Sequence, residues 1–189
     1  MRLEFIRPTA LSEICIVRQG LMKLSFSTKG WHNNSFEDFC DIAKDLKFAG
    51  IELHNIYGPL FTDKDGAFHD YTAASTLRGL YEKKLSIPCI DALNSISDSS
   101  SKEKTIDEIK KCMQIASNLN IKYVRIKSEA SEDVDGATEN CAEIIASVLP
   151  DAEAKNITLI IETSGLFADT KALRAILDSF ASDYLAALW

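Results

Sequence analysis

Glu162 is the residue whose position most clearly suggests chemistry. It ends an apolar, β-branched run, 157–161, and is followed by a short Thr-Ser-Gly turn and an amphipathic helix from about residue 169. Parallel strands of α/β proteins present reactive groups at their carboxyl ends in this way. A carboxylate there can bind a metal ion or transfer a proton, although local capping or pairing would explain the same residue equally well.

The other candidates for ligand contact also follow predicted strands. His54 and Lys127 end or nearly end two strands, Asn94 ends a third, and Trp31 and His32 lie in the loop after the first. Binding residues of barrels occupy such positions. Each candidate also has an ordinary structural explanation: a histidine satisfied within the fold, a solvated lysine or a packed tryptophan.

The hydrophobic pattern predicts six strands and five helices. The strands are 23–28, 50–54, 87–94, 121–128, 157–163 and 184–189, and the helices are 35–48, 72–84, 102–119, 136–155 and 170–180. The second helix is expected to bury Leu77, Leu80 and Tyr81. One helix between each pair of successive strands indicates repeated βα units and a parallel sheet.

Alternation along the strands separates the two architectures that fit, a doubly wound open sheet and a barrel. One set of alternate positions is uniformly apolar: Leu24, Phe26, Ile51, Leu53, Val124, Ile126, Leu159 and Ile161. The other set is polar: Ser25, Ser27, Glu52, His54, Arg125, Lys127 and Glu162. A doubly wound sheet needs two apolar faces, whereas a barrel needs only its outer face covered. The pattern therefore predicts an α/β fold of the parallel TIM-barrel type.

Two members of the polar set are expected to pair inside this barrel. Glu52 and Arg125 lie on the same inward face of their strands, one layer deeper than the strand ends. A buried carboxylate must be paired if it is to stay charged. We therefore expect a structural ion pair between them rather than a catalytic role.

Composition limits the classes of partner. The chain has 189 residues and a formal net charge of -7, which argues against a nucleic-acid partner. No apolar run approaches the roughly 18 residues of a membrane span, and the N-terminus lacks the pattern of a signal peptide. The five cysteines are scattered singly, as is typical of structural thiols in a reducing compartment. We expect a cytoplasmic protein with no membrane partner.

Four segments, 23–28, 48–53, 160–165 and 185–189, together resemble the sugar phosphate isomerase/epimerase group of the xylose isomerase-like TIM barrels. The resemblance covers about residues 22–189. It implies a small sugar or sugar-phosphate substrate whose hydroxyls the polar candidates would contact, with Lys127 binding an anionic or hydroxylated group and Trp31 stacking on the sugar face. It also implies a mechanism in which a pair of carboxylates transfers a proton next to a carbonyl group through an enediolate.

The resemblance further implies a divalent metal ion, either manganese, magnesium, cobalt or zinc. Its ligands in the family are a Glu ending strand five, an Asp ending strand six, a His from strand seven and a Glu from strand eight. Only the first maps onto this sequence, at Glu162, so that Glu162 would be both a metal ligand and a catalytic carboxylate. We expect this chain alone to bind the metal weakly and to be inactive.

Segments corresponding to the last two strands of a barrel are absent from the sequence. Because an eight-stranded barrel pairs every strand edge, we expect either a fragment of a longer enzyme or a chain that closes its open edges by self-association. Residues 1–21 are interpreted as an N-terminal extension and 22–189 as the partial barrel. Two alternatives stay open: a catalytically inert truncated barrel that serves as a binding or scaffold module, and an inosose-type dehydratase of the same superfamily.

Overall fold

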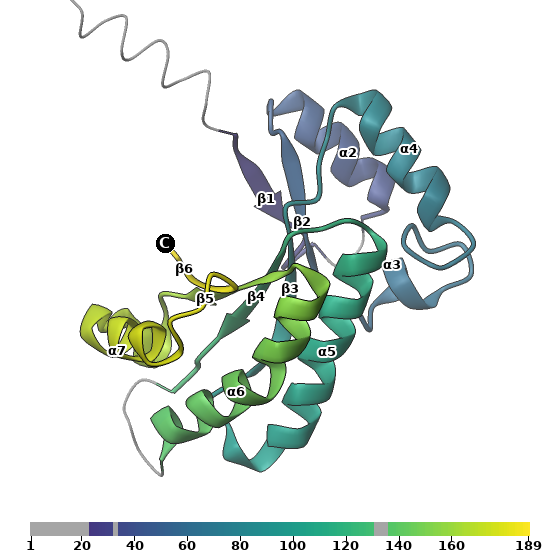
Figure 1. Ribbon diagram of the computed structural model, residues 1–189. Coiled ribbons are helices and arrows are strands. Elements are labelled where there is room, and N and C mark those ends of the chain that lie inside the picture. The colour runs from purple at the N-terminus through teal and green to yellow at the C-terminus, as the bar shows by residue number, and fades with distance from the viewer. Residues whose placement is uncertain (1–22, 32–33, 131–135) are drawn as a thin grey trace, which may run out of the picture.

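Six parallel strands form the centre of the molecule, paired in chain order (Figure 1). The computed structural model describes residues 23–31, 34–130 and 136–189, so the predicted extension 1–21 lies outside the described ranges. The strands are β1 (Ser25–Ser27), β2 (Gly50–His54), β3 (Cys89–Ser95), β4 (Tyr123–Lys127), β5 (Thr158–Glu162) and β6 (Leu185–Leu188). Each predicted strand is present, and β1 and β6 are the two edges of the sheet.

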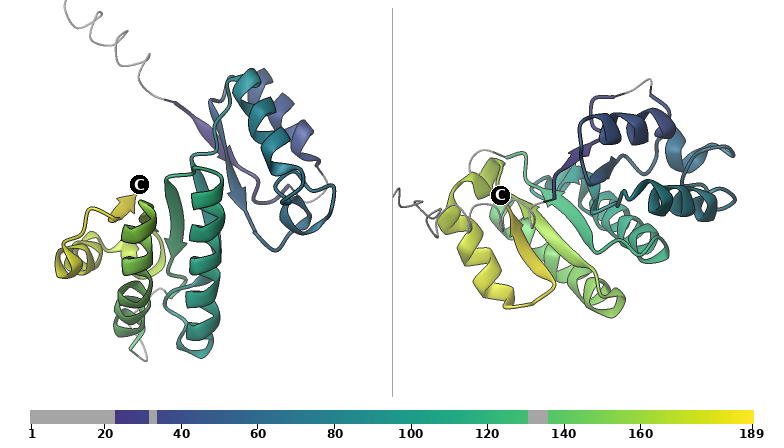
Figure 2. Two further views of the ribbon diagram at one scale, coloured as in Figure 1. Left: turned by 45° about the vertical axis from the view of Figure 1, so that its right-hand side comes forward. Right: turned by 90° about the horizontal axis from the view of Figure 1, so that it is seen from above.

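The helices lie on one side of the curved sheet, and in the views of Figure 2 no described helix covers the other side. They are α2 (Phe36–Asp45), α3 (Pro59–Thr62), α4 (Ala73–Lys83), α5 (Lys102–Asn118), α6 (Ala137–Lys155) and α7 (Thr170–Phe180), with 3-10 turns η1 (Ser99–Ser101) and η2 (Gly165–Ala168). The one-sided arrangement is that of an incomplete TIM barrel with six of its usual eight strands. Within the described ranges, no helix combines the length and apolarity needed to cross a membrane.

The core lies between the sheet and the helices, where the predicted apolar set of strand residues points. Its members on β2, β4 and β5 are fully buried: Ile51, Leu53, Val124, Ile126, Leu159 and Ile161. Two expectations for this layer are wrong. Leu24 is 57% exposed because it precedes the short edge strand β1, and Tyr81 is 84% exposed because α4 packs on the core through Leu77 and Leu80.

A glycine fixes the turn that follows β5. Gly165 has φ +55, and a Cβ atom built on it would lie 2.1 Å from the carbonyl oxygen of Ser128, just beyond β4. A side chain here would therefore push the turn after β5 away from the end of β4. Because both strands deliver polar residues to this edge of the sheet, the contact sets the spacing of the site described below.

Replacing Gly165 tests this close approach. Gly165→Ala should lower the free energy of unfolding by at least about 2 kcal/mol, because the alanine would be strained at positive φ and would clash with backbone. Gly79→Ala is the matched control: it lies inside α4 with open space around its Cα, and alanine there should stabilise the chain by roughly 0.5–1 kcal/mol. Urea denaturation measures both, and equal effects of the two changes would contradict the packing described.

Candidate functional site

Polar side chains from three adjacent strands meet on the side of the sheet away from the helices. The strand register places His54 opposite Asp91 and Asp91 opposite Arg125. Side chains at one level of parallel strands point to the same face, so these three lie in a row across β2, β3 and β4. One level closer to the carboxyl ends, Lys127 ends β4 and Glu162 ends β5.

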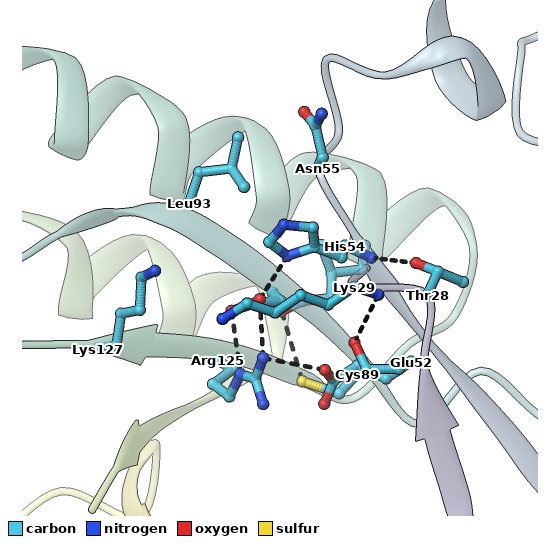
Figure 3. A network of polar contacts seen from close by, with 12 residues as sticks. Thr28, Lys29, Glu52, His54, Asn55, Cys89, Leu93, Arg125 and Lys127 are labelled. Atoms are coloured by element: carbon cyan, nitrogen blue, oxygen red, sulfur yellow. Dashed lines mark hydrogen bonds and ion pairs between the residues drawn. The ribbon is translucent and has the colours of Figure 1, made fainter. Parts of the chain in front are cut away.

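Asp91 is the centre of this row (Figure 3). Its carboxylate is fully buried and accepts a hydrogen bond from Arg125 Nε to Oδ1 at 3.0 Å, and its Oδ2 lies 2.8 Å from Arg125 Nη2 in an ion pair. Oδ2 also lies 2.6 Å from His54 Nδ1. Burial alone would raise the pKa of Asp91, but the hydrogen bonds from His54 and Arg125 outweigh it and hold that pKa below its ordinary value. Asp91 is therefore an ionised carboxylate that uses both oxygens to orient its neighbours.

His54 presents one ring nitrogen to the open side of the sheet. With Asp91 ionised, Nδ1 carries the hydrogen that it donates to Oδ2. The backbone N–H of His54 donates to Thr28 Oγ1 at 3.0 Å, which fixes the strand end from the other side. The side chain is 20% exposed. Its Nε2 is left as a hydrogen-bond acceptor for a ligand.

The predicted ion pair between Glu52 and Arg125 is present. Glu52 Oε1 lies 3.1 Å from Arg125 Nη2, close enough for an ion pair, although the two are not aligned for a hydrogen bond. Burial raises the pKa of Glu52 above its ordinary value, and the attraction of Arg125 offsets only part of that effect. Glu52 therefore lies in the interior as a structural partner, as expected from its deeper position on the strand.

Arg125 connects this interior to Glu162. Its Nε lies 3.6 Å from Glu162 Oε2, and the two side chains are 14% and 34% exposed. Burial disfavours the charged guanidinium, but the hydrogen bonds and charge of Asp91, with Glu52 and Glu162, raise the pKa of Arg125 above its ordinary value. Among the three carboxylates around Arg125, Glu162 is the most accessible, so it is the one that a substrate could reach.

The remaining sequence candidates are placed less centrally. Lys127 is only 13% exposed and pairs with Glu129 at 2.7 Å. Trp31 is 45% exposed, and its ring packs in tilted and edge contacts with two phenylalanines. Asn94 falls inside β3, one residue before its end, and His32 lies outside the described residues.

Two residues of the site were not predicted from the sequence. Asp91 is one, although counting alternate positions from the apolar Ile90 would have placed it inward. The other is Glu108 on α5, which is 1% exposed and accepts the backbone N–H groups of Leu93 and Asn94 at 2.9 Å each. Those groups lose their strand partners because the pairing of β3 with β4 shifts register between Asp91 and Ser95. The signal was a carboxylate on the apolar face of an amphipathic helix.

The cysteine in this interior is not a nucleophile. Burial, reinforced by the nearby charge of Glu52, raises the pKa of Cys89 to about 12, so its thiol stays protonated at neutral pH. Cys40, Cys112 and Cys141 are buried as well. These placements agree with structural roles for the cysteines of the described ranges.

Two cavities open at the carboxyl ends of the strands. One, of about 220 Å³, lies beside Thr28, Trp31 and His54, at the ends of β1 and β2. The other, of about 380 Å³, lies beside Asn94 and Glu129, at the ends of β3 and β4. A larger cavity of about 740 Å³ lies between α2, α3 and α4 and contains none of the residues around Arg125. The candidate residues Trp31, His54 and Asn94 therefore line the two smaller cavities, whereas Glu162 lines none of the three.

The donor set does not complete a metal site. A hard divalent cation requires several oxygen or nitrogen ligands at once. In the described part of the chain, no three His, Cys, Asp or Glu side chains converge to hold such an ion, because Arg125 lies among the carboxylates. Glu162 offers one accessible carboxylate, so a metal ion at this edge of the sheet would need ligands in addition to those described.

Six parallel strands that alternate with helices, with polar side chains at their carboxyl ends, define a barrel-type α/β protein. The chain belongs to the family of xylose isomerase-like TIM barrels, whose sequence pattern matches residues 40–189. No curated protein matches the chain. The resemblance inferred from its sequence motifs is thus confirmed at the level of the family.

Solved structures show the same fold at low sequence identity. The probable 3-DHS dehydratase AsbF of Bacillus anthracis is 22% identical, with a TM-score of 0.68, over 88% of this chain and 62% of that one. A D-tagatose 3-epimerase-like protein is 13% identical, with a TM-score of 0.65, over 87% and 63%. A xylose isomerase-like TIM barrel protein from Mycobacterium smegmatis, in complex with magnesium, is 14% identical, with a TM-score of 0.69, over 89% and 64%. The chain spans about three fifths of the length of these structures.

Substitutions at Glu52 and Asp91 should change stability in opposite directions. Folding raises the pKa of Glu52, so its protonation stabilises the folded chain at pH values below its ordinary pKa of 4.5. This stabilisation is lost as the pH rises through the higher pKa of the folded state. Glu52→Gln stays neutral, so it should be more stable than the unmodified chain at about pH 7 and nearly equal to it at low pH. Folding lowers the pKa of Asp91, so its ionisation stabilises the folded chain at pH values above its ordinary pKa of 3.8. This stabilisation is lost as the pH falls through the lower pKa of the folded state.

Asp91→Asn should therefore lower the free energy of unfolding at neutral pH by about 3 kcal/mol, because it breaks a buried ion pair. The deficit should shrink once the pH falls below 3.8. Urea denaturation of both variants and the unmodified chain, in steps from about pH 3 to pH 7, measures these differences. Destabilisation of the same sign for both variants at neutral pH would contradict the assignment of charge.

Proposed function

We propose that this chain provides the substrate-binding part, and one catalytic carboxylate, of a metal-dependent enzyme that isomerises or epimerises a sugar or sugar phosphate. The observation that supports the proposal best is the position of Glu162. It ends β5, is the most accessible carboxylate beside Arg125, and lies on the side of the sheet away from the helices. Barrel enzymes carry their active sites at this edge of the sheet.

Glu162 would exchange a proton with a carbon next to the carbonyl group of the substrate. A carboxylate positioned in this way is a suitable general base, and when protonated it returns the proton as a general acid. His54 Nε2 would accept a hydrogen bond from a substrate hydroxyl and so fix the sugar relative to Glu162. When bound, the divalent metal ion would polarise the substrate oxygens, with Glu162 as the ligand from this chain.

The similar structures support two neighbouring reactions. One relative is described as a probable dehydratase and another as a 3-epimerase-like protein. Both reaction types can begin with removal of a proton next to a carbonyl group, so an inosose-type dehydratase would use Glu162 in the same way. No three metal-binding side chains converge in the described ranges. This favours a third function for the chain by itself, that of a module that binds a sugar without catalysing a reaction.

Deuterium exchange into the substrate tests this function. In a protein that continues this chain through two further βα units, ketoses incubated with Mg²⁺ in D₂O should lose the proton signal of the carbon next to the carbonyl. Glu162→Gln should slow that exchange by at least about 100-fold, because it removes the base. Glu82→Gln, on the exposed side of α4, should have no effect.

The 189-residue chain alone is the second arm of the experiment. It should show no exchange, and titration with Mn²⁺ should reveal no tight binding at a one-to-one ratio. Exchange that persists in the Glu162→Gln variant would contradict the role of Glu162. A tight Mn²⁺ site in the chain alone, lost in Glu162→Gln, would contradict the view that its ligand set is incomplete.

A further inference from the structure

We propose that the substrate of this site is uncharged, a sugar or cyclitol without a phosphate or carboxylate group on the part that contacts β1 to β4. This inference rests on the proposed function and narrows it, because the family resemblance leaves both sugars and sugar phosphates open. Three features of the strand ends carry it: the lining of the two cavities, the pairing of the nearby cations and the hydrogen-bonding groups left available.

The cavity at the ends of β1 and β2 is lined by neutral groups. Trp31 offers a partly exposed indole face, and Thr28, Asn34 and Asn55 offer a hydroxyl and two amides. No lysine or arginine is among the described residues that line it. An aromatic wall with a few neutral polar groups suits a ring that has an apolar C–H face and hydroxyls at its edge.

The cavity at the ends of β3 and β4 repels anions. Asp98 and Glu129 contribute carboxylates to its lining, beside the hydroxyls of Ser95 and Ser97, and the described lining again includes no basic side chain. A phosphate dianion placed there would give up its hydration without gaining a cationic partner. A neutral hydroxyl group would face a much smaller penalty.

Two of the three basic side chains near the cavities are paired with carboxylates. Arg125 is held by Asp91, Glu52 and Glu162, and Lys127 is held by Glu129 at 2.7 Å. Lys29, which Figure 3 draws with the network, is exposed, so its charge is screened by solvent. Five acidic side chains therefore lie near three basic side chains at this edge. Neither Arg125 nor Lys127 is free to bind an anion.

Two hydrogen-bonding groups remain available for hydroxyls. Thr28 Oγ1 accepts from the backbone of His54, which leaves its own O–H hydrogen to donate. His54 donates through Nδ1 to Asp91, which leaves Nε2 to accept. One group that donates and another that accepts suit sugar hydroxyls, which both donate and accept, better than a phosphate, which only accepts.

Paired ligands test the inference on the 189-residue chain. We would titrate D-fructose and D-fructose 6-phosphate and follow backbone amides and the Trp31 indole N–H by two-dimensional NMR. The neutral sugar should shift Trp31, His54 and Asn94, and it should bind at least about tenfold more tightly than the phosphate ester. Trp31→Ala should weaken binding of the neutral sugar.

A variant that changes the charge near Lys127 tests whether charge sets the preference for the neutral sugar. Glu129→Gln frees Lys127 and removes a negative charge, so it should reduce the preference for the neutral sugar at least about threefold. Glu153→Gln removes the same charge from α6, where Glu153 bonds Ser182, and should leave the preference unchanged.

The outcomes separate the inference from the proposed function. Tighter binding of the phosphate ester at Trp31 and His54 would overturn the inference and leave the sugar isomerase proposal intact. If neither ligand shifts a residue at the strand ends, even at about 50 mM, both the inference and the proposed function are contradicted. An equal change of preference in Glu129→Gln and Glu153→Gln would contradict the inference that charges at the ends of β3 and β4 select against an anionic substrate.

Discussion

The contact between Arg125 and Asp91 is the interaction on which the rest of the site depends. Asp91 is completely removed from solvent, and an isolated carboxylate in that position would lose several kilocalories per mole of hydration. A hydrogen bond of 3.0 Å and an ion pair of 2.8 Å from one guanidinium compensate for that loss. The same guanidinium then attracts Glu52 from one side and Glu162 from the other. One buried cation therefore sets the positions of carboxylates from three different strands.

This arrangement explains how the side of the sheet away from the helices can carry polar residues: they are satisfied by protein partners. His54 and Arg125 satisfy Asp91 from the two neighbouring strands, and the register of β2, β3 and β4 brings them to one level. Glu108 satisfies the backbone in a similar way. It accepts hydrogen bonds from the two N–H groups that lose their partners where the register between β3 and β4 shifts. Such irregularities at barrel rims commonly redirect side chains toward a binding site. The rim is thus shaped by a charged residue that lies on the outer helix layer.

Sequence pattern predicted the elements well and the site only in part. The apolar and polar sets of strand residues were sufficient to predict a one-sided sheet, because a side chain must alternate between faces along a strand. They also predicted the Glu52–Arg125 pair. Asp91 was not predicted because it lies in a strand whose other residues are nearly all apolar or small. The role of Glu108 was not predicted because it depends on a register shift that no local pattern reveals. Tyr81 was misplaced because the helical period alone does not show which part of the helix meets a neighbour.

A double-mutant cycle measures how strongly Asp91 and Arg125 depend on each other. The free energy of unfolding would be measured by urea denaturation for Asp91→Asn, Arg125→Met, the double variant and the unmodified chain at neutral pH. We expect a coupling energy of at least about 2 kcal/mol, because each single change leaves a buried partner uncompensated. The exposed pair of Arg174 and Asp178 on α7, treated in the same way, should give less than about 0.5 kcal/mol. A coupling between Asp91 and Arg125 as small as that of the exposed pair would contradict the account.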